Sequence, residues 1–505
     1  MLNTYQNKKE PDILEVISDL SNDEVFTPPA VAKQMLDLLP AEIWTDPSLR
    51  WIDPFTKTGV FLREITKRLL VGLEAVIPDD RERLEHILHN MVFGVAITEL
   101  TSLMSRRSLY CSKWADSEKS VVKFSSKQGN CIYNRIEHEF VRGRCSECFA
   151  GETQHGGSNE TENYAYALLH QEGRRIIEKE IGLKFDVVVG NPPYQMDSDG
   201  GTRTIPLYNL FVEQAMALQP GHISMVIPSR WMAGGLGLSE FRDNMLSDQH
   251  FRRLVDFPNA KEVFPGVEIK GGVCFFLWDK NHEGKCQSSF VRDGVESQTA
   301  DRNLGQFDVF VRDHRSLSIL DKVQRAGLPS ITEILSADKE FGWTSNFRGF
   351  SKEQIPQGVP LYFNEKSKRQ QGWIERAAIT KSPHLIDKWK VMVPQAGSDG
   401  GQKLPDSVLG STLIASSPSV CTQTYLFFFV GSEKEAQSVE SYVKTKFFRY
   451  LVSLRKISQD ATRSTYLWVP SLEWSVEWSD QELYRRFQLD AQEVALIESH
   501  VRERS

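Results

Sequence analysis

The stretch FDVVVGNPPY at residues 185–194 decides the fold. Its first five residues form an apolar run of the kind that parallel strands need when both faces of a sheet are covered. The run breaks at once into Gly190, Asn191, two prolines and an aromatic residue. This pattern places a polar side chain at the carboxyl end of a parallel strand, which is where α/β sheets hold their ligands.

The chemistry of Asn191-Pro192-Pro193-Tyr194 indicates recognition of a planar amino group. Each proline fixes its own φ at about −65° and restricts the residue before it, so the turn is rigid. The Asn191 amide oxygen and the Pro192 carbonyl can accept both hydrogens of one exocyclic NH2 group, while Tyr194 offers a ring face for stacking. Two acceptors favour a tetrahedral nitrogen whose lone pair points at an electrophile. An ordinary strand followed by an Asn-Pro turn is the alternative interpretation.

The sequence around this stretch predicts a domain organisation. From about residue 23 to 278, short apolar runs alternate with helical periodicities, which is typical of a doubly wound α/β domain. Polar sequence bearing glycine and cysteine interrupts the alternation, and beyond about residue 300 turn-rich, aromatic-rich sequence indicates an α+β domain. We expect an N-terminal extension at 1–22, a catalytic domain at 23–299 with an insertion at 111–157, and a second domain at 300–505.

Composition and charge exclude several classes of protein. The 505 residues are 40% hydrophobic and 25% charged, which excludes disorder, collagen-like repeats and coiled coils. A net charge of −7 leaves nucleic-acid binding to a local basic groove. No apolar run reaches the roughly 18 residues of a membrane span, and the N-terminus lacks the apolar region of a signal peptide. We therefore expect a cytoplasmic protein with no membrane contact.

With these motifs in place, the chain resembles the γ-class N6-adenine DNA methyltransferases of bacterial restriction-modification systems. The resemblance covers about residues 23–280 clearly, with the NPPY string following the cofactor motifs and a recognition domain last. It implies a Rossmann-like methyltransferase domain that transfers a methyl group from S-adenosylmethionine to a flipped adenine. The residues that it implies as catalytic are Asn191, Pro192, Pro193 and Tyr194. The implied partners are double-stranded DNA and a separate helicase or nuclease restriction subunit.

The string WIDPFTKTGVF at residues 51–61 lies where this family binds S-adenosylmethionine. A strand that ends near an aspartate, a turn with a glycine and a following helix let backbone amides approach a cofactor closely. The family's string is similar to D-P-x-x-G-x-G-x-F, and here Lys57 replaces the first glycine. The residues that remain in register are Asp53, Pro54, Gly59 and Phe61.

Further cofactor contacts are implied by the same resemblance. The segment Phe26-Thr27-Pro28 is similar to the one that covers the methionine end of the cofactor, and it also suits a capped helix N-terminus. The family usually places an acidic residue against the ribose where this chain has Ala96, and Glu99 is the substitute we expect. Asn130 resembles the residue that contacts the cofactor adenine.

A cysteine cluster in the insertion predicts a structural zinc site. Cys145 and Cys148 form a C-x2-C knuckle, and further cysteines and histidines nearby suffice to complete a tetrahedral site. Small polar insertions cannot build much core, so a metal would explain how this segment folds. Methyl transfer needs no open coordination position. The expected ligands are Cys111, His138, Cys145 and Cys148, with Cys131 as the alternative fourth.

The second domain is expected to recognise DNA, because a base must be rotated out of the duplex before methylation. It carries basic-aromatic stretches whose lysines and arginines would neutralise phosphates, at residues 366–381, 384–390 and 444–456. Two rival functions stay open. One is a methyltransferase acting on RNA or on protein glutamine. The other is a non-catalytic DNA-binding subunit, suggested by Lys57 and Ala96 at cofactor positions.

Overall fold

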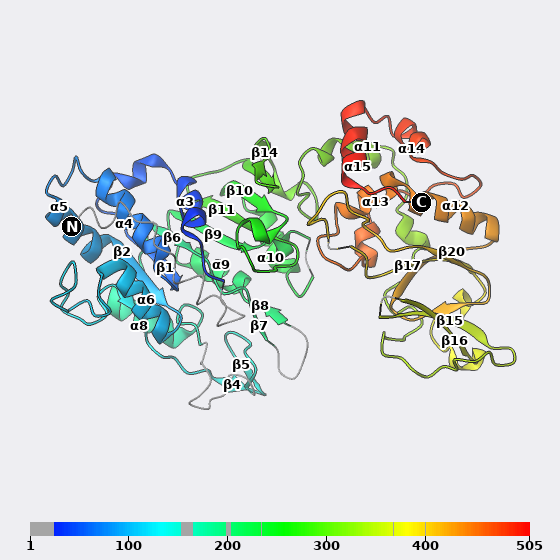
Figure 1. Ribbon diagram of the computed structural model, residues 1–505, viewed down its shortest axis with the longest axis horizontal. Helices are drawn as coiled ribbons and strands as arrows, with labels where there is room; N and C mark the ends of the chain where they lie inside the picture. The colour runs from blue at the N-terminus through cyan, green and yellow to red at the C-terminus, as the bar shows by residue number, and fades with distance from the viewer. Residues whose placement is uncertain are drawn as a thin grey trace. The chain divides into compact units, whose positions relative to one another are not determined.

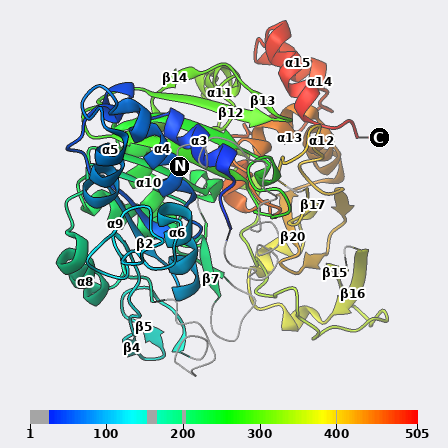
Figure 2. The ribbon, with the colours of Figure 1, turned by 60° about the vertical axis from the view of Figure 1, so that its left-hand side comes forward.

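The computed structural model describes residues 25–152, 165–197, 204–233, 235–366, 368–398 and 400–504. The predicted extension at residues 1–22 lies outside them. The chain divides into two compact units, Met1–Asp308 and Val309–Ser505, whose elements can be followed in Figures 1 and 2. No helix in the described ranges has the length and apolar character needed to cross a membrane.

The first unit is built on one large mixed sheet. The strand order is β13-β12-β10-β11-β9-β6-β1-β2-β3, with β14 paired to β12. The strand bounds are β1 (Trp51–Thr56), β2 (Val92–Ala96), β3 (Cys131–Ile132), β6 (Val187–Gly190), β9 (His222–Pro228), β10 (Phe251–Phe257), β11 (Val273–Asp279), β12 (Cys286–Arg292), β13 (Val295–Glu296) and β14 (Ala300–Arg302). All residues of β1 and β6 are buried, as the continuous apolar runs predict for strands covered on both faces.

The direction of the strands creates a switch point between β1 and β6. Strands β3, β2, β1, β6 and β9 pair in parallel, whereas β11 is antiparallel to both β9 and β10. The chain runs from β1 outward to β2 and β3, then crosses back to β6 on the other side of β1. Open α/β sheets bind ligands at such a reversal, beyond the carboxyl ends of the two strands. The predicted α/β fold is confirmed by this sheet.

Helices accompany the parallel strands (Figure 1). Helix α4 packs against α3 and α6 as well as against β1 and β2. The helices of this unit are α3 (Pro29–Asp37), α4 (Val60–Gly72), α5 (Asp80–His86), α6 (Glu99–Tyr110), α8 (Gln171–Ile181), α9 (Tyr208–Ala217) and α10 (Ser239–Ser247). Each βα connection therefore brings a helix N-terminus to the carboxyl edge of the sheet.

Two short hairpins stand outside this sheet. Strands β4 (Phe140–Val141) and β5 (Arg144–Cys145) lie in the predicted insertion, and β7 (Gln195–Asp197) and β8 (Thr204–Pro206) directly follow the NPPY turn. The prediction that residues 111–157 stand apart from the parallel sheet is wrong at β3. That strand pairs with β2, but its two residues are too few to show a strand pattern in the sequence. Residues 153–157 lie outside the described ranges.

The second unit combines helices with two three-stranded sheets. One sheet has the order β16-β15-β19 and the other the order β18-β17-β20. The bounds are α11 (Ser316–Arg325), β15 (Val359–Glu365), β16 (Lys368–Ile374), β17 (Trp389–Pro394), β18 (Leu413–Ala415), β19 (Val420–Cys421), β20 (Tyr425–Val430), α12 (Glu433–Lys444), α13 (Lys446–Ser453), α14 (Asp480–Arg486) and α15 (Ala491–His500). Strand β17 separates two cores, because Val391 and Val393 face the helices while Met392 faces the other sheet.

Candidate active site

A pocket lies at the switch point of the first unit, between the ends of β1 and β6. Its lining combines three segments that are far apart in the sequence: the residues before α3, the β1–α4 connection, and the turn after β6. The lining residues are Thr27, Asp53, Phe55, Lys57, Thr58, Gly59, Val60, Phe61 and Asn191. The structure thus brings together five predicted residues, Thr27, Asp53, Gly59, Phe61 and Asn191.

The β1–α4 turn depends on a glycine. Gly59 precedes α4 with a φ of +73°, in the left-handed region that favours glycine. A Cβ at this position would lie 3.0 Å from the Ser105 Cα in α6. Among the described residues, no side chain caps the α4 N-terminus. Its first backbone N–H groups and the positive end of the helix dipole are therefore available to a ligand in the pocket.

The close approach of β6 to β1 depends on a second glycine. A Cβ at Gly190 would lie 2.6 Å from the Phe55 ring and 2.9 Å from the Asp53 Oδ1. No side chain fits between these strands at that level. The glycine before the NPPY turn therefore lets Asn191 follow Asp53 closely across the strand ends.

Asp53 contributes a buried carboxyl group to the pocket. It is 3% exposed, and its Oδ1 accepts a hydrogen bond of 3.1 Å from the Phe55 backbone N–H. Burial raises the pKa of Asp53 to about 7, against the opposing effects of that hydrogen bond and of the Lys57 charge. A carboxyl whose pKa is raised by desolvation and that lines a pocket is a candidate functional group.

Lys57 and Asn191 fasten the segment before α3 to the pocket. The Lys57 Nζ donates to the Val25 carbonyl at 3.0 Å, and the Asn191 Nδ2 donates to the same carbonyl at 3.0 Å. Asn191 also donates to the Thr27 Oγ1 at 3.1 Å. The lysine at the family's glycine position is therefore a buried tether. The sequence analysis noted this departure but did not foresee the contact, which joins residues far apart in the chain.

The Asn191 Oδ1 is the atom of the site that indicates most about a ligand. It is buried, and no described residue donates a hydrogen bond to it. Because the Nδ2 is engaged by Val25 and Thr27, the oxygen is oriented as an acceptor toward the pocket. An unpaired buried acceptor costs about 1–3 kcal/mol, so its persistence indicates a ligand that supplies the missing donor.

The rest of the NPPY turn is buried beside the pocket. Tyr194 is 8% exposed, its ring meets Phe264 edge to face at 6.4 Å, and its hydroxyl has no hydrogen-bond partner among the described residues. Burial raises the pKa of Tyr194 well above its usual range. The hydroxyl of Tyr208, at the start of α9, is likewise buried without a described partner. Pro192 and Pro193 are buried as well.

Apart from Asn130, the remaining predicted cofactor residues lie either next to residues of the pocket or at the start of α6. Phe26 and Pro28 are half-buried on either side of Thr27, and Pro54 is buried within β1. Glu99 is exposed at the start of α6, just beyond the carboxyl end of β2 and therefore on the ligand-binding edge of the sheet.

The position of Asn130 contradicts the prediction that it contacts the cofactor adenine. Its Nδ2 donates to the Leu88 and His89 carbonyls, each at 2.8 Å. Those residues precede β2, so the amide points toward the amino end of the strands, away from the carboxyl edge. The sequence analysis misplaced Asn130 because the two-residue β3 begins only at the next residue.

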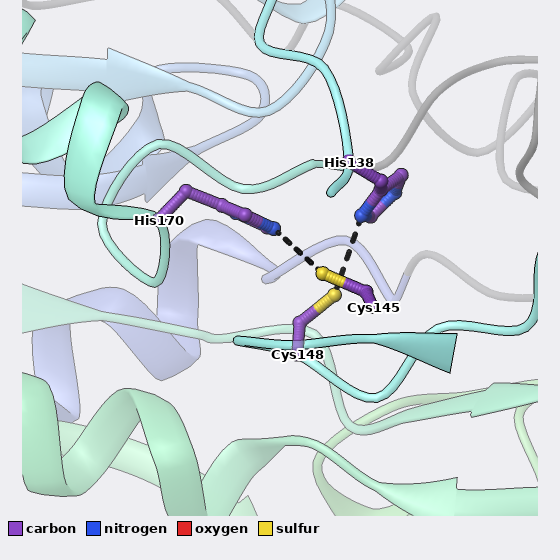
Figure 3. A group of neighbouring side chains, drawn as sticks. All are labelled: His138, Cys145, Cys148 and His170. Carbon is purple, nitrogen blue, oxygen red and sulfur yellow. Dashed lines mark hydrogen bonds between the residues drawn. The ribbon is translucent and has the colours of Figure 1, made fainter. Parts of the chain in front are cut away.

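A second cluster of functional side chains lies at the β4–β5 hairpin. His138, Cys145, Cys148 and His170 offer ligand atoms that all lie within 4.8 Å of one another (Figure 3). The predicted ligand Cys111 is not among them. It ends α6 in the left-handed conformation, with a φ of +59° and an exposed side chain.

The alternative ligand Cys131 is also absent from this cluster, because it is buried in β3 beneath Gly94 of β2. His170 takes the fourth position instead. The sequence analysis missed His170 because it follows the predicted insertion, and the chain returns to the hairpin only after the residues beyond position 157. A histidine just before an amphipathic helix was the one signal available.

In the second unit, an open groove gathers polar side chains. Its lining includes Asn364, Arg369, Gln395, Gln423 and Thr424. The buried Oε1 of Gln423 has no described hydrogen-bond partner. Amide and guanidinium groups are those that read base edges in the major groove. The groove therefore resembles the Asn191 pocket in presenting an unpaired amide oxygen.

The predicted basic stretches of this unit have different positions. In 444–456, Arg449, Arg455 and Lys456 are buried, and Arg449 donates to the Arg502 carbonyl at 2.8 Å. In 384–390, Lys390 is buried and donates to the Lys388 carbonyl at 2.8 Å. These side chains support the core, which contradicts their prediction as phosphate ligands. The stretch 366–381 instead contains β16 and the residues that follow it, with Lys368 and Arg369 exposed.

Comparisons with known proteins identify the family. Residues 90–264 match the model of the Eco57I restriction-modification methylase family. A protein of Mycoplasma pneumoniae described as an uncharacterized adenine-specific methylase is 35% identical over 323 residues, which cover 58% of this chain and 76% of that protein. The chain therefore belongs to the adenine-specific methylase family of restriction-modification systems. The predicted resemblance is confirmed, and neither rival function gains support.

Solved structures show the fold likeness. The Type ISP restriction-modification enzyme LlaGI, solved with a DNA substrate mimic, matches with a TM-score of 0.51 and 11% identity, covering 90% of this chain and 47% of LlaGI. The DrdV–DNA complex matches with a TM-score of 0.47 and 10% identity, covering 87% and 55%. The chain thus spans about half the length of these solved proteins. The LlaGI match supports a mixed α/β, methyltransferase-like fold.

Proposed function

We propose that this chain transfers a methyl group from S-adenosylmethionine to the N6 atom of an adenine rotated out of duplex DNA. The unpaired Asn191 Oδ1, buried at the switch point beside Asp53, carries this proposal. An adenine amino group supplies the hydrogen-bond donor that this oxygen lacks. The family membership fixes the class of reaction, and the pocket suggests which residues perform it.

The residues of the pocket fit S-adenosylmethionine. The Asp53 carboxyl can accept from cofactor donors, and the free N–H groups of α4 suit the cofactor's negatively polarised groups. Phe55 and Phe61 offer apolar walls, and the tethered segment of Phe26, Thr27 and Pro28 would cover the cofactor. We retain Pro54, Gly59 and Glu99 as proposed supports of this site. When bound, S-adenosylmethionine supplies an electrophilic methyl group on a sulfonium.

The NPPY turn would prepare the adenine nitrogen for attack. Asn191 Oδ1 and the Pro192 carbonyl would accept the two amino hydrogens, which directs the nitrogen lone pair out of the ring plane. The new N–CH3 bond forms as the S–CH3 bond breaks, the sulfur keeps the bonding electrons, and the nitrogen then loses one proton to solvent. No strong base is required, since most of the rate enhancement comes from orientation and exclusion of water.

Tyr194 would stack on the flipped adenine, and Pro193 would hold the turn rigid. The ring is buried in the absence of DNA, so base entry has to displace the side chains that cover it. Flipping enzymes commonly hold the extruded base between aromatic or apolar side chains, and Phe264 lies beside Tyr194 for that purpose.

The second unit would select the DNA sequence. Its groove offers Arg369, Asn364 and Gln423, whose planar groups match the donor and acceptor patterns of guanine and adenine in the major groove. We accordingly assign catalysis to the first unit and target recognition to the second, and we move the predicted boundary from 299/300 to Asp308/Val309 because β14 pairs with β12 of the first unit. An Arg369→Ala change is expected to weaken discrimination at one base by about 1–3 kcal/mol, measured by methylation of a randomised oligonucleotide pool.

The proposal extends to assembly and location. LlaGI and DrdV were solved with DNA or a DNA mimic, which supports double-stranded DNA as the substrate of this chain. A helicase or nuclease subunit remains a proposed partner, and a cytoplasmic location remains a prediction. The finer fold description, with a zinc-binding insertion and an α+β recognition domain, belongs to the same proposal.

The proposal is tested by incubating the protein with genomic DNA and methyl-labelled S-adenosylmethionine, followed by modification-sensitive sequencing. Wild-type protein is expected to give N6-methyladenine at one sequence motif. Asn191→Ala is expected to lose at least about 100-fold in rate, as when one oriented acceptor or donor is removed from a catalytic site. Asn90→Ala changes an exposed asparagine far from the pocket and serves as the matched control. Label found only in RNA or protein would contradict the proposal.

A further inference from the structure

We propose that His138, Cys145, Cys148 and His170 bind one zinc ion that fastens the β4–β5 hairpin to the N-terminus of α8. These residues come from three places in the chain: the irregular segment before β4, the knuckle itself, and the residue before α8. Figure 3 shows their side chains converging on one point. The site differs from the pocket at the switch point and takes no part in methyl transfer.

Two sulfur–nitrogen distances match those of a tetrahedral zinc site, and all four ligand atoms lie within 4.8 Å of one another. With Zn–S bonds of about 2.3 Å and Zn–N bonds of about 2.0 Å, the sulfur and nitrogen corners of a tetrahedron lie about 3.5 Å apart. The Cys145 Sγ lies 3.5 Å from the His170 Nε2, and the Cys148 Sγ lies 3.5 Å from the His138 Nδ1. Two thiolates with two imidazoles are a donor set that selects zinc among the common divalent metals.

The orientation of His170 is fixed as metal ligands usually require. Its Nδ1 lies 2.8 Å from the Tyr166 carbonyl, so this nitrogen carries the proton and donates it. The Nε2 is then the unprotonated nitrogen, and it faces Cys145. A backbone carbonyl that holds the second nitrogen of a histidine in this way is typical of zinc sites.

Burial in the hairpin shows what holds it together. Over residues 137–152, the buried side chains larger than glycine are those of Cys145, Cys148 and Ala150. Val141 is 54% and Phe149 is 50% exposed, and Phe140 is only half-buried. A hairpin that buries its cysteines and leaves these three side chains exposed or half-exposed has little apolar core of its own. A bound metal supplies the folding free energy that such a segment lacks.

The contacts around the cluster join the hairpin to α8. Glu147, between the two cysteines, accepts a hydrogen bond of 2.8 Å from the Gln171 backbone N–H at the start of α8. Gly173 in the same helix leaves room for Ile136, whose Cδ1 would lie 2.4 Å from a Cβ placed there. The metal would therefore close a joint that is already shaped by hydrogen bonding and packing.

Metal analysis of the full-length protein tests this proposal. Purified protein is expected to hold one zinc ion per chain. Cys148→Ser and His170→Ala are expected to lower zinc affinity by more than about 100-fold, since removing even a supporting contact costs 10- to 100-fold. Cys111→Ser is the matched control, because it removes a cysteine of the same segment that lies outside the cluster, and it should keep the zinc.

Cobalt substitution gives a reading that does not depend on the variants folding. Wild-type protein and Cys111→Ser are expected to show the strong visible bands of tetrahedral cobalt, with sulfur-to-cobalt charge transfer from two thiolates. Wild-type protein that binds neither zinc nor cobalt in competition with a chromogenic chelator would overturn the proposal. So would a Cys111→Ser variant that loses the metal, or Cys148→Ser and His170→Ala variants that bind it as tightly as wild type.

Discussion

The NPPY turn and the β4–β5 hairpin are both polar loops, yet they are held in place by different means. The turn follows the buried strand β6 and is positioned by the sheet, by two prolines and by the close approach that Gly190 permits. The hairpin has almost no buried apolar side chain and is positioned by its polar contacts with α8 and by the proposed metal. A loop that follows a buried strand can use the rigidity of the sheet, whereas we propose that the outlying hairpin relies on a bound metal.

Removal of the metal is expected to have the largest effect and to separate the two loops. Structural zinc contributes about 10–16 kcal/mol to the folding of small zinc modules, so chelation should open the hairpin completely. Hydrogen exchange is expected to accelerate over residues 137–152, while β1 and β6 keep their protection. Equal acceleration of exchange in β1 and β6 would show that the hairpin supports the whole first unit. That result would contradict the difference between the two loops described above.

Asn191→Ala should lower the methylation rate strongly but change the stability of the protein little. We expect a rate loss of about 100- to 1,000-fold, or about 3–4 kcal/mol of transition-state stabilisation. Thermal stability should change by less than about 1 kcal/mol, because the substitution also removes a buried acceptor that has no partner among the described residues. The comparison of turnover with thermal unfolding measures both. A variant that loses activity only because it unfolds would refute the assigned role.

Asp53 predicts a pH dependence of stability that the hairpin does not share. Its pKa of about 7 in the folded protein exceeds the usual 3.8, so the folded state binds more protons than the unfolded state between these values. Stability is therefore fully present below about pH 4 and falls by up to about 4 kcal/mol as the pH rises through 7. Asp53→Asn should flatten this part of the profile in denaturant titrations. A parallel profile for the variant would contradict the assignment.

Alanine substitutions at two glycines, one before the NPPY turn and one in the hairpin, should differ in how much stability they cost. Gly190→Ala forces a Cβ against Asp53 and Phe55, and a loss of about 2–4 kcal/mol is expected. Gly143→Ala, in the hairpin, meets no atom within 4 Å and costs only the strain of its φ of +79°, about 1 kcal/mol. Denaturant titration of both variants measures the difference. Equal losses would mean that strand approach at Gly190 is not a constraint.

Particular residues show how far prediction from sequence reached. Thr27, Asp53, Gly59, Phe61 and Asn191 meet in one pocket because each sits on a local pattern, a strand end or a helix start, whose place in an α/β sheet is known in advance. Asn130 failed because it precedes a strand of only two residues. The prediction for the basic stretch at 444–456 failed at Arg449 and Lys456, because folding buries both side chains and their polar ends bind the Arg502 and Ser398 carbonyls.

The sequence by itself determined the α/β fold, the family and the place of the NPPY turn at a strand end. These follow from short-range features, since an apolar run, a glycine and two prolines dictate local backbone geometry wherever they occur. Only the tertiary structure decided that Lys57 holds the Val25 carbonyl, that no described residue donates to the Asn191 Oδ1, and that His170 joins the two cysteines. Those contacts depend on how distant segments pack, and no local pattern encodes which partner a folded chain brings within reach.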